Sequence, residues 1–529
     1  MSSLDPLGAA LERDVPAEER HGRGQYFTPD PLVRFVLSLV DTATGAPLRV
    51  LDPACGSGRF LLGAQERWGQ RDLELFGYET DPEARRRALA QVDDASISPQ
   101  SFLGAGPTQR MDLVVGNPPY IRRRGEKRDV YVDFIERSLE HLVEGGRLAF
   151  VLSNAWLSAG YGRSVRELLL SRFAVEWMIE SVAESWFPGA SVNTMILVAR
   201  RCDEPAARAA QSVRFAQLTS PLPASPKIVR ALPQGQLRVD RAWAPLLRAP
   251  DLFLELSTSR RVCPLGDLAT VRRGFTTNDN AFFYPPQDSG IEEGFLRPLV
   301  KSPRDVPGVR CRAADLQHKV LVCDEDWGAL KGPHAKGLRR WLRLHGRGRA
   351  AANWRLRPQE PSRLFLAKGY HDRFRQAVAD VPAYVDQQIY GVYPKGGRDV
   401  ALLAGLLNSA WFQLAVELTG RVNFGDGVLW LGLVDARERL TLPNPTAWDT
   451  GRIERVVEAF GSLPDGRVPP VDTVRQDPTW AQPREQLDRE LAAGLGVSWG
   501  EYRDLQIHGE MMCRRRIHLA ALRRKAATH

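Results

Sequence analysis

Apolar and polar positions alternate in blocks over the first 200 residues of the chain. Short apolar runs predict strands, and each run is followed by a segment with apolar positions at helical spacing. Strands that alternate with helices predict an α/β fold with a doubly wound, mostly parallel sheet. The predicted strands are residues 48–51, 73–78, 111–115, 147–152, 174–180 and 194–199, and the predicted helices include 31–40, 59–67, 130–143 and 164–173.

The pattern changes after residue 200. Residues 202–250 are rich in Pro, Ala and Arg, which predicts an irregular connector. Residues 255–445 carry short strand candidates among many Gly and Pro residues, with one apolar helix at 401–415, and residues 452–460 and 484–525 are predicted helical. We therefore expect a catalytic α/β domain, a connector, a mixed α+β domain and C-terminal helices, in this order: 1–215, 216–254, 255–445 and 446–529.

Charge separates the two parts of the chain. Lys and Arg number 23 and Asp and Glu 27 in residues 1–200, a net charge of −4, whereas residues 201–529 hold 49 and 36, a net of +13. A basic second part is typical of a surface that faces nucleic acid, but the Arg-rich bias of a genome gives the same composition, and composition does not decide between them.

The patterns of cysteine, histidine and hydropathy argue against a disulfide-bonded, a metal-binding or a membrane-spanning protein. The six cysteines never form C-x-x-C and the nine histidines show no metal-ligand spacing, so we expect no disulfide framework and no metal. No apolar run approaches about 20 residues and the N-terminus lacks a signal-peptide core. The expected compartment is the cytoplasm, with no membrane partner.

The first candidate site follows the first predicted strand, where residues 52–58 read Asp-Pro-Ala-Cys-Gly-Ser-Gly. Ligands of a doubly wound sheet sit at the carboxyl ends of its strands, and Gly56 and Gly58 let the backbone approach a ligand closely. Glu79 ends the second predicted strand, where a carboxylate accepts both hydroxyl protons of a ribose. The structural alternatives are a tight turn without a ligand and a helix-capping role for Thr80 or Asp81.

The second candidate site is Asn117-Pro118-Pro119-Tyr120, directly after the strand at 111–115. The prolines fix φ and lack an N–H, so the loop is stiff and presents carbonyl acceptors. Together with the Asn117 side chain, these acceptors take both protons of an exocyclic amine whose ring lies on Tyr120. Two such bonds localise the lone pair of the amine, which predicts catalysis by positioning and electrostatics, without a covalent intermediate.

With Gly-Gln-Tyr-Phe-Thr-Pro at residues 24–29, these motifs resemble the amino-methylating DNA methyltransferases. More narrowly, the chain resembles the gamma arrangement with a C-terminal target-recognition domain of the TaqI/Eco57I kind, over about residues 22–445. The resemblance implies a Rossmann-like methyltransferase domain, S-adenosylmethionine as the cofactor, and double-stranded DNA as the partner, from which the target base is flipped.

The resemblance also implies roles for individual residues. Glu79 holds the ribose of the cofactor. The methionine part is bound by the segment before the first helix and by the glycine turn: Thr28, Asp52, Ala54, Gly56 and Gly58. The target amine and base are bound by the amine loop, residues 117–120, and by one later aromatic residue: Asn117, Pro118, Pro119, Tyr120 and Phe187.

One position departs from the family pattern. About sixteen residues before Asn117 the family has Asp-Phe, whose Asp accepts a hydrogen bond from the adenine amine of the cofactor, and this chain has Ser101-Phe102. Phe102 is expected to cover the adenine, whereas Ser101 is a shorter and uncharged acceptor. We therefore expect weaker cofactor binding in the absence of DNA.

Candidate DNA contacts come from two segments. A basic run after the amine loop lies where phosphates must pass, although a solvated loop is the ordinary alternative. The segment 274–282 resembles the opening of the recognition domains and lies beside further basic residues. The candidates are Arg122, Arg123, Arg124, Lys127, Arg272, Arg273, Thr277 and Asn278.

The sequence thus predicts methylation of adenine N6 in duplex DNA by a nucleoid-associated monomer, in a restriction-modification or phage-defence setting. Cytosine N4 presents the same amine and stays open. RNA or protein-glutamine methylation and a non-catalytic DNA-binding subunit are further alternatives. We find no nuclease motif, so a restriction endonuclease is expected to be a separate chain.

Overall fold

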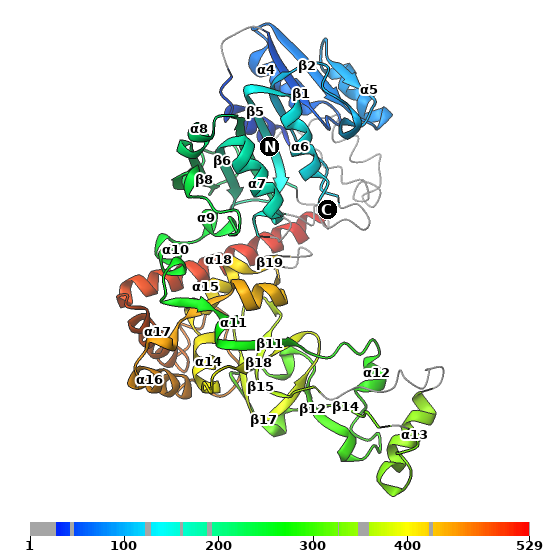
Figure 1. The fold of residues 1–529 in the computed structure, drawn as a ribbon, viewed down its shortest axis with the longest axis vertical. Coiled ribbons are helices and arrows are strands. Elements are labelled where there is room, and N and C mark those ends of the chain that lie inside the picture. Colours follow the sequence, from blue (N-terminus) through cyan, green and yellow to red (C-terminus); the bar gives the residue numbers. More distant parts are fainter. Residues whose placement is uncertain are drawn as a thin grey trace. The chain divides into compact units, whose positions relative to one another are not determined.

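The computed structural model describes residues 28–42, 47–121, 129–158, 162–187, 193–325, 327–346, 359–422 and 427–527. The chain divides into two compact units (Figure 1), one built mainly from residues up to Arg248 and the other from Ala249 to Ile517. The boundary falls inside the stretch that was expected to connect two domains, residues 216–254.

A nine-stranded sheet forms the centre of the first unit, with the strand order β3-β2-β1-β4-β5-β7-β6-β8-β9. Neighbours from β3 to β5 pair in parallel, while β7 is antiparallel to both β5 and β6. All six predicted strands are present, and the prediction of a mostly parallel, Rossmann-like sheet is confirmed. The strands are β1 (Leu48–Asp52), β2 (Leu73–Tyr78), β3 (Ser96–Ser98), β4 (Met111–Gly116), β5 (Leu142–Ser153), β6 (Phe173–Ser181), β7 (Thr194–Arg201), β8 (Ser212–Leu218) and β9 (Lys227–Pro233).

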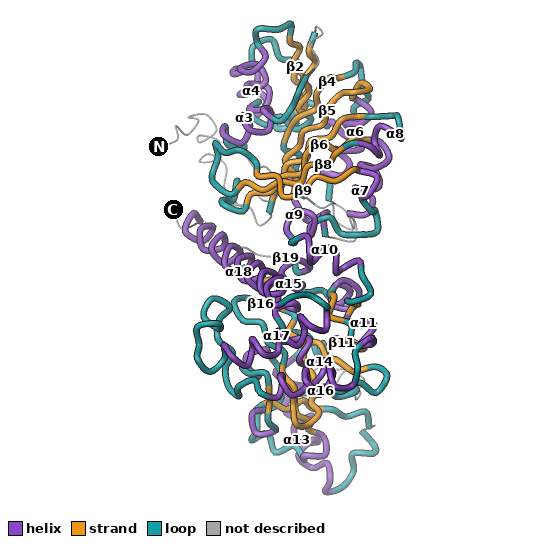
Figure 2. Tube along the Cα trace, turned by 90° about the vertical axis from the view of Figure 1, so that its left-hand side faces the viewer, coloured by secondary structure: helices purple, strands orange, loops and turns teal. Residues whose placement is uncertain are grey.

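Helices cover both faces of this sheet (Figure 2). On β4, Leu113 and Val115 belong to the core on one face, whereas Val114 belongs to the core on the other. Strands buried on both faces are continuous apolar runs, which is why the sequence predicts them well. One face carries α3 (Asp30–Ser38), α4 (Arg59–Trp68) and α5 (Pro82–Gln91), and the other carries α6 (Tyr131–His141), α7 (Gly162–Arg172) and α9 (Ala244–Arg248).

The prediction of an irregular connector at 202–250 is wrong. This stretch contains β8 and β9, which extend the sheet at one edge, and the short helix α8 (Pro205–Ala210). In β8 the apolar residues Val213 and Phe215 are fully buried and alternate with polar positions. The surrounding Pro, Ala and Arg residues dominate the composition, so the short alternating run was not recognised as a strand.

The second unit contains a mixed sheet of seven strands in the order β11-β18-β15-β17-β12-β14, with β13 beside β17. Its largest core joins this sheet to helices from the C-terminal region, including residues of the predicted helical region 446–529. The strands are β11 (Ala269–Arg273), β12 (Leu296–Val300), β13 (Arg310–Cys311), β14 (His318–Leu321), β15 (Ser362–Ala367), β17 (Ala377–Val385) and β18 (Ile389–Pro394), and the helices are α14 (Val400–Leu407), α15 (Ala410–Thr419), α16 (Thr450–Gly461), α17 (Ala481–Leu495) and α18 (Trp499–Ala527).

The single apolar helix predicted at 401–415 is in fact two helices, α14 and α15, with a bend of 63° between them. Asn408 ends α14 because its Nδ2 donates to the carbonyl oxygens of Ala404 and Gln376. Ser409 begins α15, since its hydroxyl accepts from the Phe412 N–H at 3.1 Å. Among the described helices none is by itself long and apolar enough to cross a membrane, and only this pair reaches that length and composition when taken together.

Candidate active site

The glycine turn lies at the carboxyl end of β1. Gly56 and Gly58 have φ of 53° and 89°, in the left-handed region that favours glycine. A Cβ on Gly58 would lie 3.1 Å from side-chain atoms of Ala88 and Val92. The order of strands reverses between β1 and β4, and ligands of such sheets bind in the crevice outside that switch point.

Glu79 connects the end of β2 to the glycine turn. Its Oε2 accepts from the Gly56 N–H at 2.9 Å and its Oε1 from the Asp81 N–H at 2.7 Å. Burial raises the pKa of this carboxyl group, although the two backbone bonds oppose the shift. A carboxylate has about four lone-pair sites, so both oxygens can still accept from a diol. The capping role belongs to Asp81, which accepts from two N–H groups of α5.

Asp52 ends β1 as a carboxyl group that is 2% exposed. Its Oδ1 accepts from the Ala54 N–H at 3.0 Å, and no cation in the described part of the chain forms an ion pair with it. Burial raises its pKa to about 8. A Cβ on Gly116, at the end of the neighbouring β4, would lie 2.7 Å from Asp52 Oδ1. This buried acid is suited to a cationic ligand group, because a nearby cation stabilises the charged form.

We expect Asp52→Asn to flatten the pH dependence of stability. Because the folded pKa of about 8 lies above the ordinary 3.8, the contribution of Asp52 is full below about pH 4 and is lost as the pH rises toward 8. Melting temperatures between pH 5 and pH 9 should therefore fall less steeply in the variant than in the wild type. The exposed Asp94→Asn serves as the control, and parallel curves for Asp52→Asn and the wild type would contradict this expectation.

The amine loop follows β4, which pairs with β1. The Tyr120 hydroxyl donates to Asn117 Oδ1 and also lies 3.2 Å from the carbonyl oxygen of Val151. Pro118 is buried, and the other three residues of the loop are half-buried. The structure therefore places the side-chain carbonyl of Asn117 beside the ring of Tyr120.

Phe187 lies opposite Tyr120, with 6.5 Å between the ring centroids and 75° between the ring planes. It is 5% exposed. A base stacked between two rings needs parallel planes about 7 Å apart, twice the base spacing of about 3.4 Å. The separation of the rings is close to this value but their angle is not, so one ring must turn before a base can enter.

Ser101 and Phe102 differ in how they meet solvent. Ser101 is exposed and its side chain caps no N–H of the following turn, Phe102–Gly104. The Phe102 ring is 1% exposed and packs against Tyr78 and Phe134, with centroids 5.3 and 5.6 Å away. Phe102 thus packs against the half-buried Tyr78, and its own ring has almost no exposed surface with which to contact the cofactor adenine. Tyr78 directly precedes Glu79 and was not among the site residues expected from the sequence.

Thr28 is buried just before α3, and its carbonyl oxygen accepts from Arg59 Nη1 at 2.7 Å. Arg59 is the first residue of α4, so this bond ties the segment before α3 to the glycine turn. The sequence analysis did not identify Arg59. The rest of the predicted segment, residues 24–27, lies outside the described residues, and so do the DNA-contact candidates Arg122, Arg123, Arg124 and Lys127.

The basic candidates of the second unit lie at the end of β11. Arg272 is exposed, and its Nη1 donates to Glu360 Oε2 at 2.5 Å, which offsets its charge. Arg273 is exposed and lies near Lys368, whose pKa is lowered by burial and by the charge of Arg273. Lys368 and Arg273 therefore bring two positive charges close together. Lys368 stands alone in the sequence, so no motif identified it as a candidate DNA contact.

Thr277 and Asn278 lie in the loop that follows β11. Thr277 is half-buried, and Asn278 is exposed with a left-handed φ of 56°. The loop is anchored by Phe275, which donates to the carbonyl of Val385 at 2.8 Å and accepts from the N–H of Gln387 at 2.9 Å. The two main-chain hydrogen bonds of Phe275 thus fix the start of the loop that carries Thr277 and Asn278.

The chain is similar to known DNA methyltransferases. The N-6 DNA methylase family matches residues 9–236. The Type II methyltransferase M.XamI of Xanthomonas campestris pv. amaranthicola is 25% identical over 382 residues, which cover 65% of this chain and 68% of that protein. The Type II methyltransferase M.TthHB8I of Thermus thermophilus is 30% identical over 210 residues, which cover 35% of this chain and 47% of that protein.

A solved structure extends the comparison to the second unit. The Type IIL restriction-modification enzyme MmeI in complex with DNA matches 96% of this chain and 78% of its own, with a TM-score of 0.55 and 14% identity. That identity shows a shared fold and no more. Residues 9–236 are similar to the N-6 DNA methylase family, and the chain is a DNA methyltransferase whose methyl donor is S-adenosylmethionine.

Proposed function

We propose that the protein transfers a methyl group to the exocyclic N6 of adenine in duplex DNA, as the modification enzyme of a restriction-modification system. The observation that carries this proposal is the pairing of β1 with β4, because the glycine turn ends one strand and the amine loop ends the other. Paired strands lie about 4.8 Å apart, so the two loops face one crevice. The proposed enzyme is a monomer in the cytoplasm at the nucleoid, and an accompanying endonuclease is a separate chain.

The described residues fit S-adenosylmethionine, which supplies an electrophilic methyl group on a sulfonium. Asp52 Oδ2 accepts no hydrogen bond from the described residues and lies in a buried acid, so it suits the ammonium of the methionine part. Glu79 has acceptor capacity left for the ribose hydroxyls. Gly56 and Gly58 leave room for close approach, and Thr28 is held near them through Arg59.

Asn117 and Pro118 activate the target amine by accepting hydrogen bonds from its two N–H groups. An exocyclic amine is a poor nucleophile because its lone pair is conjugated with the ring. The Tyr120 hydroxyl orients the Asn117 amide, and an amide oxygen has two lone pairs, so Oδ1 has the capacity to accept more than one hydrogen bond. The Pro118 carbonyl oxygen accepts a hydrogen bond from the other N–H group of the amine. Both bonds favour a tetrahedral nitrogen, and catalysis then consists of positioning and charge stabilisation.

Tyr120 and Phe187 hold the flipped base between them. Once one ring has turned from the 75° arrangement, each offers an aromatic face, and stacking of this kind tolerates either base that carries an exocyclic amine. Outside the pocket, the proposed phosphate and base contacts of the second unit are Arg272, Arg273, Thr277 and Asn278, together with Lys368. The run Arg122, Arg123, Arg124 and Lys127 stays a prediction for the DNA backbone.

A methyl-transfer assay with a radiolabelled donor and with DNA, RNA and protein as parallel substrates tests the proposal. The expected product is N6-methyladenine in duplex DNA, identified by mass spectrometry after digestion to nucleosides. N4-methylcytosine would reassign the target base, while label only in RNA or in protein, or no label at all, would refute the proposed function.

We expect Ser101→Asp to tighten binding of the cofactor in the absence of DNA. The Asp carboxylate reaches further than the Ser hydroxyl and accepts a charge-assisted hydrogen bond, so the dissociation constant should fall by about tenfold. Isothermal titration of S-adenosylmethionine into both proteins measures the change. Ser96→Asp, at an exposed position of β3, is the matched control. Equal affinities of Ser101→Asp and the wild type would reject the idea.

A further inference from the structure

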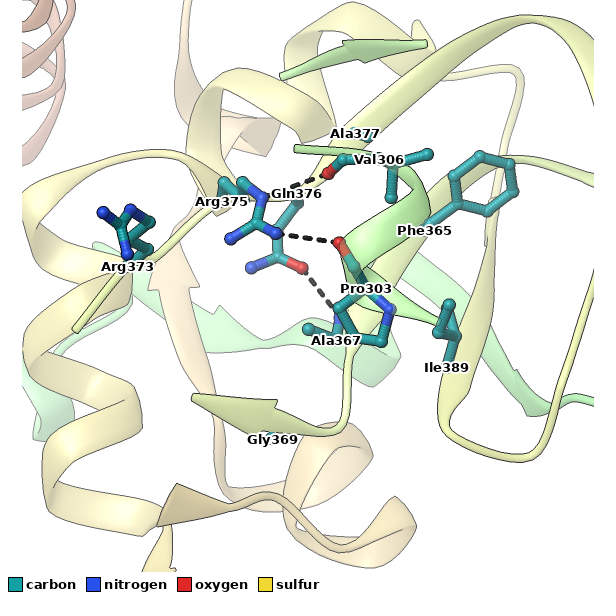
Figure 3. A pocket seen from close by; sticks show the side chains of 10 residues that line it. All are labelled: Pro303, Val306, Phe365, Ala367, Gly369, Arg373, Arg375, Gln376, Ala377 and Ile389. Atoms are coloured by element: carbon teal, nitrogen blue, oxygen red, sulfur yellow. Dashed lines mark hydrogen bonds between the residues drawn. The ribbon is translucent and has the colours of Figure 1, made fainter. Parts of the chain in front are cut away.

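A recess in the second unit lies between η5 (Pro303–Asp305), β15 and the turn that leads into β17 (Figure 3). Its volume is about 360 Å³ including the open mouth. Val306, Phe365 and Ile389 give it an apolar wall, and Arg373, Arg375 and Gln376 give it a polar one. None of these residues takes part in the proposed methyl transfer.

Arg375 supplies a positive charge that no carboxylate offsets directly. Its Nε and Nη2 donate to the carbonyl oxygens of Val306 and Pro303 at 3.0 and 2.8 Å (Figure 3). Its Nη1 makes no hydrogen bond, and no acid in the described ranges lies within ion-pair distance of the guanidinium. Burial and the charges of Arg373 and Arg467 lower its pKa. A half-buried, unpaired charge of this kind costs free energy that a bound anion would recover.

Gln376 supplies an orphaned donor to the same recess. It is 1% exposed, and its Oε1 accepts from the Ala367 N–H at 2.9 Å, which fixes the orientation of the amide. Its Nε2 is buried and has no hydrogen-bond partner among the residues that the structure describes. Figure 3 shows Nε2 on the side toward Arg373 and Arg375. The neighbouring Tyr370 is 1% exposed, and burial raises the pKa of its hydroxyl although the Gln376 side chain opposes the shift.

The charge balance around the recess favours an anion. Arg373 donates to both carboxylate oxygens of Asp372, at 3.2 and 3.3 Å, so that acid compensates Arg373. Arg375 is left with its full charge, and the exposed Arg467 adds another. Arg375 Nη1 and Gln376 Nε2, two groups without a hydrogen bond among the described residues, are both donors. A guanidinium and an amide N–H match the several acceptor oxygens of a phosphate.

We propose that this recess binds a phosphate group, whose oxygens accept hydrogen bonds from Arg375 Nη1 and Gln376 Nε2. The phosphate is either a free ion or part of a DNA backbone. In the first case the inference is independent of methyl transfer, and in the second it rests on the proposed function.

Gln376→Glu separates this role from a structural one. The Glu side chain keeps an oxygen for the Ala367 N–H and places a carboxylate beside Arg375 as a built-in counter-ion. We expect the melting temperature of the variant in chloride to equal or exceed that of the wild type. On exchange of chloride for inorganic phosphate at constant ionic strength, the wild type should gain about 3–6 °C more than the variant. Gln482→Glu, exposed on α17, is the matched control and should respond like the wild type.

The comparison with the variant matters because phosphate stabilises most proteins to some degree by exclusion from their surface. That general effect is equal in all three proteins, so only the difference reports binding. Equal gains in the wild type and Gln376→Glu would overturn the proposal. A marked loss of stability of Gln376→Glu in chloride would do so too, because a recess built for an anion tolerates the carboxylate.

A second measurement identifies the source of the phosphate. The ³¹P line width of inorganic phosphate should increase with wild-type protein and stay narrow with Gln376→Glu. Addition of duplex DNA that displaces the ion assigns the recess to the DNA backbone, whereas retention of the ion assigns it to free phosphate. Because these measurements need no methyl transfer, their failure is distinguishable from a failure of the proposed function.

Discussion

Asn117→Ala is expected to lower the single-turnover rate constant of methyl transfer by about 10²–10³-fold. The substitution removes Oδ1, which accepts a hydrogen bond from the Tyr120 hydroxyl in the structure. In the proposed mechanism the same oxygen accepts a hydrogen bond from the target amine. Affinity for duplex DNA should stay within about threefold of the wild type, because phosphate contacts elsewhere supply most of it. Labelled donor in excess over DNA measures the rate, and fluorescence anisotropy measures the affinity.

Asn117→Asp is the matched variant, since it keeps side-chain oxygens at the same position and should retain more activity than Asn117→Ala. Near-normal turnover of Asn117→Ala would refute the role of Asn117. A parallel loss of DNA binding and of thermal stability would instead show that the substitution damages the fold, and the melting temperature of each variant distinguishes the two results.

Removal of Glu417 is expected to destabilise the second unit by about 3–5 kcal/mol. Its side chain is 2% exposed and that of Arg516 is 6% exposed, with Arg516 Nη2 and Nε at 2.7 and 3.1 Å from its two oxygens. Arg516 Nη2 also donates to the His371 carbonyl at 2.7 Å and its Nη1 to the carbonyl of Gly427. Glu417→Leu leaves this guanidinium buried without its counter-ion, which is the source of the cost.

Urea denaturation of Glu417→Leu, of Arg516→Met and of the double variant tests the buried pair. The double variant should recover much of the stability, because it removes both charges and keeps the volume. The pair Arg489–Glu485 on α17 is about half-exposed at both ends and provides the control, where Glu485→Leu should cost less than about 1 kcal/mol. If Glu417→Leu costs no more than Glu485→Leu, the buried pair does not stabilise the fold as argued.

The fold of the first unit was predictable from sequence because its strands are buried on both faces. A strand buried on both faces must be apolar at consecutive positions, so a continuous apolar run such as residues 111–115 identifies it in the sequence. Six strands were predicted from runs of this kind. β8, which lies next to the edge strand β9, lacks this signal because Arg214 and Gln217 interrupt its apolar positions. The break between α14 and α15 was missed for a different reason. It depends on side-chain bonds of Asn408 and Ser409 that form only after the helices pack.

The candidate site was predictable where its residues are contiguous and less so where packing creates them. Asn117 and Tyr120 are three residues apart, and the loop that joins them has little conformational freedom. Arg59 and Lys368, in contrast, meet their neighbours only through tertiary contacts. The burial of Phe102 under Tyr78 likewise follows from how α6 packs on the sheet and not from the dipeptide itself.

The register of β1 and β4 has a consequence for how the DNA specificity of such an enzyme can evolve. Val50 pairs with Leu113 and Leu51 with Val114, in the interior of the nine-stranded sheet of the first unit. The spacing between the donor loop and the acceptor loop is therefore set by main-chain bonds, which tolerate almost any exchange of surface side chains. The residues around β11 that we propose as DNA contacts belong to the other compact unit. New target sequences are thus accessible to drift or engineering without any retuning of the reaction itself.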